Sequence, residues 1–85
     1  MKKKKLLSNL LSGSGDNNFQ FADLIQILVW LGFTERLDKG SHRIFILKGI
    51  QDMINLQPTK DSKAKPFQVK QVREFIINHR LISND

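Results

Sequence analysis

The sequence contains no cysteine. This absence excludes disulfide scaffolds, thiolate zinc sites and cysteine nucleophiles, and it fits a reducing compartment. Long apolar runs are also missing: the leucines that follow Lys2 to Lys5 are interrupted by Ser8 and Asn9, and the stretch ends at the polar residues 12–15. Such a segment is too short and too broken for an export signal or a membrane span. We therefore expect a cytoplasmic protein with no membrane partner.

Acidic residues are scarce, because 8 Asp plus Glu stand against 14 Lys plus Arg and give a net charge of +6. A basic surface attracts polyanions, of which nucleic acid is the first candidate. The few acidic and histidine residues do not recur at the spacing of metal ligands, so two-metal cleavage is not expected. The sequence thus favours a nucleic-acid partner over a small-molecule substrate, with no cofactor and no metal.

The 85 residues suffice for one small core. We divide the chain at residue 18, into a basic, leucine-containing segment with a flexible hinge over residues 1–18 and one domain over residues 19–85. Four leucines at helical spacing predict a short helix over residues 3–12, which is marginal in water unless it docks. The hinge, residues 12–18, is polar or glycine throughout and has no apolar anchor.

A helix over residues 20–31 is predicted by apolar residues that recur every three or four positions, namely Phe21, Leu24, Ile25, Leu28 and Leu31. Residues 16–18 can supply capping oxygens or favourable negative charge before it, and Gly32 suits the position just after its end. Ile27 and Trp30 form a second apolar stripe. This stripe needs a cover, which either the leucines of residues 3–12 or a partner protein can provide.

After this helix the apolar period changes to two, which predicts three short strands at residues 33–37, 43–47 and 53–56. Short turns at residues 38–40 and 48–49 make them an antiparallel meander. A polar, lysine-rich loop over residues 59–65 leads to Pro66, which opens a last helix that runs to about Arg80. Its inward residues are expected to be Val69, Val72, Phe75 and Ile76. The order predicts an α+β fold with two helices on one face of a sheet, the layout of double-stranded-RNA-binding-domain-like folds.

The glycine turn at residues 39–41 delivers His42 onto the second apolar strand. Histidine can take or give a proton near neutral pH, because its unperturbed pKa is about 6.5. A lone histidine at such a junction is nevertheless more often a surface or capping residue. Ser41 fits a turn residue better than a nucleophile, since no second histidine or carboxylate is placed to complete a triad. His79, near the end of the last helix, suits the helix dipole and receives no catalytic role.

The stretch Lys39-Gly40-Ser41-His42-Arg43-Ile44-Phe45 resembles the Gly-Ser-His turn of HicA-type toxins of bacterial toxin–antitoxin systems. Three further stretches are similar to parts of that family: Leu24 to Phe33, Asn55 to Pro58, and Lys63 to Val69. The resemblance covers about residues 19–81. Many members carry two adjacent histidines in the turn, and this chain has Arg43 in the second position.

The resemblance implies a cytoplasmic, metal-independent endoribonuclease that cleaves translated mRNA and is silenced by a HicB-type antitoxin. It also implies that His42 is the catalytic residue. RNA supplies its own nucleophile, the 2′-hydroxyl, so one histidine acting as general base can suffice, and such catalysis typically contributes about 10²–10⁴-fold. Lys39 and Arg43, if near in space, would favour the neutral imidazole and hold phosphates. The general acid is left open between Lys39, Lys65 and water.

The residues that we assign to substrate binding are Lys39, Gly40, Ser41, Arg43, Lys63 and Lys65. The lysines of residues 60–70 suit contacts to the RNA backbone, which add affinity with little sequence selectivity. Lys2 to Lys5 either bind RNA or fray in solvent. Two other functions stay open: a non-catalytic RNA-binding module of the same fold, and a protein-interaction domain whose apolar stripes, including Ile27 and Trp30, bind a partner.

Overall fold

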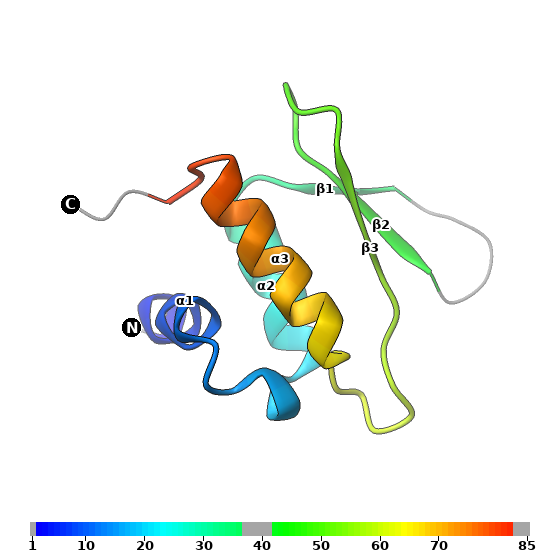
Figure 1. Cartoon of the computed structure of the whole chain (residues 1–85). Helices are drawn as coiled ribbons and strands as arrows, with labels where there is room; N and C mark the ends of the chain where they lie inside the picture. The colour runs from blue at the N-terminus through cyan, green and yellow to red at the C-terminus, as the bar shows by residue number, and fades with distance from the viewer. Residues whose placement is uncertain (1, 37–41, 83–85) are drawn as a thin grey trace.

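A computed structural model describes residues 2–36 and 42–82. The chain forms α1 (Lys2–Ser12), a short 3-10 helix η1 (Asp16–Asn18), α2 (Phe21–Trp30), β1 (Thr34–Arg36), β2 (Arg43–Ile46), β3 (Met53–Leu56) and α3 (Pro66–Asn78). The elements form three layers, with α1 on one side of the helix pair α2 and α3 and the sheet on the other (Figure 1). The α+β fold expected from the sequence, with an additional N-terminal helix, is confirmed.

The sheet is an antiparallel meander in the order β1-β2-β3. Its register pairs Phe45 with Glu35 on one side and with Ile54 on the other. Successive side chains of a strand point to opposite faces, so Phe45, Ile54 and Leu56 share the face toward the helices, where all three are buried. The other face carries residues such as Met53 and Asn55, which are exposed.

The first two strands differ slightly from the bounds that the sequence suggested, and Leu37, the expected last residue of the first, lies outside the described residues. Phe33 precedes β1 because its N–H bonds to the carbonyl of Leu28 at the end of α2, and Leu47 begins the connection to β3. The turn expected at residues 38–40 lies outside the described residues. The third strand has the expected bounds.

Helix α2 ends as its sequence predicts and begins differently. Gly32 takes a φ of 97° just past the helix, and its N–H and that of Phe33 bond back to Val29 and Leu28, which is a Schellman motif. At the N-terminus the cap is Gln20, with no side-chain capping bond. The expectation that residues 16–18 cap α2 is wrong, because these residues form η1 instead. The charge of Asp23 in the first turn still complements the helix dipole.

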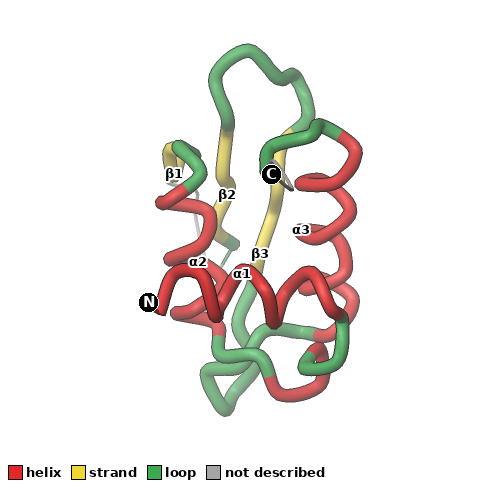
Figure 2. Tube along the Cα trace, turned by 90° about the vertical axis from the view of Figure 1, so that its left-hand side faces the viewer, coloured by secondary structure: helices red, strands yellow, loops and turns green. Residues whose placement is uncertain are grey.

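Helix α1 covers the second apolar stripe of α2. Leu10 of α1 is fully buried in the common core, and Ile27 of α2 is fully buried as well. Lys3 places its Nζ 5.9 Å from the ring of Trp30, a cation–π distance. In the view of Figure 2, α1 lies across α2 and α3. Of the two covers considered from the sequence, the N-terminal leucines are therefore the one that the structure shows.

The segment expected to be a flexible hinge has a polar anchor. Arg73 of α3 donates to both carboxylate oxygens of Asp16, at 2.9 and 3.0 Å, and its Nη1 also donates to the carbonyl of Leu10. The bond to Asp16 raises the pKa of Arg73. Both side chains of this pair are largely buried. A single arginine thus joins α1, η1 and α3.

Helix α3 begins with Pro66 and buries the four residues expected to face inward. It ends two residues before the expected end, because His79 is the C-cap and Arg80 takes a left-handed φ of 53°. No helix in the described part of the chain is both long and apolar enough to cross a membrane.

Candidate active site at the rim of the sheet

His42 lies just before β2 and is exposed to solvent. Its Nδ1 is 3.1 Å from Oδ1 of Asn55. An amide oxygen only accepts hydrogen bonds, so Nδ1 carries the proton in this pair. A neutral imidazole held in this way has its lone pair on Nε2, which is then the nitrogen that can accept a proton. His42 is therefore an exposed imidazole that Asn55 orients.

Asn55 is the residue that the functional reading of the sequence missed. It lies on β3 opposite Ile44, on the face of the sheet away from the helices. The strand register indicates this contact. Because Arg43 pairs with Leu56, His42 and Asn55 are diagonal neighbours across the two strands. Period-two alternation also places Asn55 on the exposed face, since its neighbours Ile54 and Leu56 are buried.

Arg43 points to the opposite face from His42. Its Nε and Nη2 donate to the two carboxylate oxygens of Glu35 at 2.6 and 2.7 Å. Its guanidinium carbon lies 5.7 Å from the ring of Phe21 and 5.9 Å from that of Phe45. The paired hydrogen bonds lower the pKa of Glu35 and raise that of Arg43.

The expected influence of Arg43 on His42 required the two side chains to be near in space. Arg43 instead pairs with Glu35, and its guanidinium lies near the rings of Phe21 and Phe45 on the helix side of the sheet. A contact of Arg43 with RNA is therefore expected on that side, and its substrate-binding role stays a prediction. Lys39, Gly40 and Ser41, the other predicted residues of this turn, lie outside the described residues.

The lysine-rich loop lies at the same rim of the sheet as His42. β2 begins where β3 ends, since Arg43 pairs with Leu56, and the loop follows directly from β3 (Figure 1). Backbone hydrogen bonds hold this loop in place: Lys63 forms a bridge with Gln20, and the N–H of Ala64 bonds to the carbonyl of Phe19 at 2.8 Å. Lys65 is the N-cap of α3.

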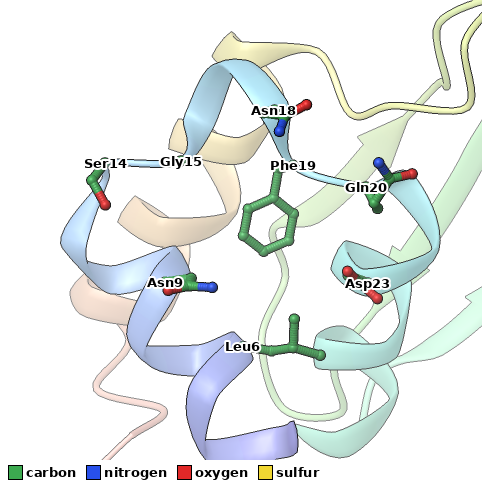
Figure 3. Close-up of a pocket in the computed structure, with 8 residues that line it drawn as sticks. All are labelled: Leu6, Asn9, Ser14, Gly15, Asn18, Phe19, Gln20 and Asp23. Carbon is green, nitrogen blue, oxygen red and sulfur yellow. The ribbon is translucent and has the colours of Figure 1, made fainter.

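Figure 3 shows a separate hollow of about 260 Å³ between α1 and α2. The ring of Phe19 forms its floor, and Asn9 and Asp23 approach it from the two helices. None of the residues predicted from the sequence to act in catalysis or binding lines it. Asp23 has a structural role there, in the first turn of α2.

His79 has contacts that fit a structural role. Its Nε2 is 3.5 Å from Oδ2 of Asp52, and its ring lies 4.4 Å from that of Phe75. It thereby joins the end of α3 to the β2–β3 connection. Within residues 2–36 and 42–82, no three His, Asp or Glu side chains come together as a metal site would require.

Comparison of the chain with models of protein families, with curated proteins and with solved structures finds no match.

Proposed function

We propose that the protein is a metal-independent endoribonuclease of the HicA toxin type, with His42 as its acid–base residue. The observation that carries this proposal is the geometry of His42, an exposed imidazole oriented by Asn55. The Gly-Ser-His turn that precedes β2 and the order of the elements support the same family.

The chemistry needs one proton acceptor and no cofactor. Nε2 of His42 removes the proton of an RNA 2′-hydroxyl, and the 2′-oxygen attacks the adjacent phosphorus. The bond from phosphorus to the 5′-oxygen breaks, which leaves a 2′,3′-cyclic phosphate on one product. The 5′-oxygen takes a proton from a lysine or from water and becomes a 5′-hydroxyl. A histidine suits this step because its imidazole can take and give a proton near neutral pH.

The loop lysines supply the electrostatic part of the site. Lys60, Lys63 and Lys65 stand against one acidic residue, Asp61, in the loop that follows β3. Positive charges of this kind attract the RNA backbone whatever its sequence. Such contacts add little selectivity for RNA sequence. A site with a single proton acceptor also predicts a slow enzyme.

A HicB-type antitoxin is the expected inhibitor. None of the described helices covers the sheet face that carries Asn55 (Figure 1), and this face exposes apolar surface at Met53, which is 51% exposed. A protein seated on this face would bury that apolar surface and cover His42 at the same time. This arrangement supports the partner expected from the family resemblance.

Induced expression in a bacterial host tests the proposal. The wild type should arrest growth and degrade mRNA, and His42→Ala should do neither while it remains folded. His79→Gln is the matched control, because it removes the other histidine and should leave toxicity intact. If His42→Ala were as toxic as the wild type, or if no form cleaved RNA in vitro, the catalytic proposal would be lost. Undiminished RNA binding without cleavage would favour the RNA-binding module.

A further inference from the structure

The described surface has a second, larger hollow on the helix side of the sheet rim. It measures about 600 Å³, within the range of about 300–1,000 Å³ that is typical of small-ligand sites. Phe21, Ile25 and Pro58 give it apolar walls, and Arg43 and Ser62 add polar groups. It opens between the first turns of α2 and the chain that follows β3.

The walls of this hollow are held by hydrogen bonds in the free protein. The carbonyl of Ser62 accepts the N–H of Phe21 at 3.1 Å, which fastens the loop to the start of α2. Ser62 keeps a left-handed φ of 62° in doing so, a conformation that costs a non-glycine residue free energy. The hollow is therefore preformed, and a ligand needs to order little of the chain.

Arg43 is the polar group best placed to recognise a ligand. Glu35 accepts hydrogen bonds from Nε and Nη2, and no described residue accepts one from Nη1. Arg43 lines the hollow and Glu35 does not. The salt bridge and the ring of Phe21 fix the guanidinium plane. A fixed planar cation of this kind can stack on one nucleobase while its free N–H groups donate to acceptors elsewhere on the same strand.

We propose that this hollow binds one base of a single-stranded RNA, beside the phosphodiester that His42 cleaves. His42 and Arg43 are successive residues whose side chains leave opposite faces of the sheet, so an RNA strand that crosses the rim presents a phosphate to His42 and a neighbouring base to the hollow. Charge complementarity supports RNA as the occupant, since the loop that forms one wall carries Lys60, Lys63 and Lys65 against Asp61. The assignment rests on the proposed function, whose substrate is RNA.

A variant in which the hollow is filled distinguishes recognition of a nucleobase from general attraction of anions by the basic surface. Ala22 lines the hollow and is exposed, so Ala22→Leu fills it without changing charge or removing a core residue. Val29→Leu is the matched control, on an exposed position of the same helix outside the hollow. Both changes are made in the His42→Ala background, so that binding is measured without cleavage. The probes are a labelled single-stranded RNA dodecamer and an inorganic polyphosphate of similar charge.

Ala22→Leu should weaken RNA binding by about fivefold or more, because stacking of one base contributes on the order of 1–3 kcal/mol. It should leave polyphosphate binding unchanged, and Val29→Leu should change neither affinity. Equal RNA affinity for the two variants would overturn the proposal, as would an equal loss for polyphosphate or preferential binding of an apolar peptide in the hollow. Failure of the proposed function would be distinct: the parent protein would then cleave no RNA, whatever Ala22→Leu does to binding.

Discussion

At the scale of single residues, the candidate chemistry depends on one hydrogen bond between two exposed side chains. Asn55 Oδ1 holds Nδ1 of His42 and so leaves Nε2 free. Since Asn55 is exposed, its removal creates no cavity in the core. Its contribution is expected to be positional, with an effect on the rate of reaction rather than on folding.

Asn55→Ala should lower the kcat of RNA cleavage by about tenfold while KM and the free energy of unfolding stay close to those of the wild type. The effect should be smaller than that of His42→Ala, which removes the base itself and should cost about 10²–10⁴-fold. Single-turnover cleavage of a labelled RNA measures both variants. An unchanged kcat in Asn55→Ala would show that the ring needs no orientation by this amide.

Glu35 gives the fold a defined pH dependence. Its pKa is lowered in the folded state by the hydrogen bonds from Arg43, so its stabilising effect is present above the usual glutamate pKa of about 4.5 and is lost as the pH falls through the lowered folded value. Glu35→Gln should therefore be less stable than the wild type at pH 7, and the difference should narrow as the pH falls below about 4.5. Urea unfolding at a series of pH values measures it; a constant difference would contradict the account.

Arg80 takes a conformation that a glycine would hold more easily. It occupies the left-handed position of a Schellman motif after α3, where the N–H of Leu81 bonds to the carbonyl of Ile76 at 3.0 Å. Arg80→Gly should be more stable than Arg80→Ala by about 1 kcal/mol, because only glycine avoids the strain of a positive φ. Both variants lack the charge of Arg80, so the difference between their stabilities contains no contribution from its interaction with the helix dipole. Equal thermal unfolding of the two would contradict the prediction.

At the scale of elements, α1 is part of the core rather than an appendage. Leu10 is fully buried, whereas Leu11, the next residue, is only partly buried against the core. Leu10→Ala should lower the free energy of unfolding by about 2–5 kcal/mol, as expected for truncation of a buried leucine, and Leu11→Ala should cost clearly less. Denaturant unfolding gives both values. Equal small effects would mean that α1 does not dock.

The sequence predicted the elements better than the contacts between them. Periodicity identified the helices and strands because it reflects which face of each element is buried, and the stripe of Ile27 and Trp30 indicated that α2 needed a second cover. The anchor between Asp16 and Arg73 was not predictable in this way, because the two residues are 57 positions apart and no local pattern joins them. Prediction of Asn55 as the hydrogen-bond partner of His42 requires the strand register, which the sequence pattern alone does not give.

The face of the sheet on which Arg43 lies could have been predicted from the sequence. It lies two residues before the buried Phe45, so strand alternation already places it on the core side and His42 on the other. The functional interpretation treated the two as neighbours because they adjoin in sequence. Side chains of adjacent residues in a strand point to opposite faces. This places His42, the candidate proton acceptor, on one face and the hollow proposed to bind a nucleobase on the other.

At the scale of the whole molecule, the candidate functional residues of the described chain lie at one rim of the sheet. The start of β2, the end of β3, the lysine loop and the first turns of α2 meet there (Figure 1). Helix α1 and the anchor at Arg73 lie on the far side of the helix pair and stabilise the fold. A net charge of +6 on so small a domain favours the approach of polyanions from any direction, and under the proposed function the rim is the place where RNA would be cut.

The most direct test of the central claim is the chemical nature of the product ends. Purified wild-type protein, incubated with RNA in excess EDTA, should yield 2′,3′-cyclic phosphate and 5′-hydroxyl ends. A single 2′-deoxy nucleotide at the cleaved position should abolish the cut, and His42→Ala should produce no such ends. Cleavage that stops with EDTA, leaves 3′-hydroxyl ends or persists in His42→Ala would contradict His42 as the base that activates the 2′-hydroxyl.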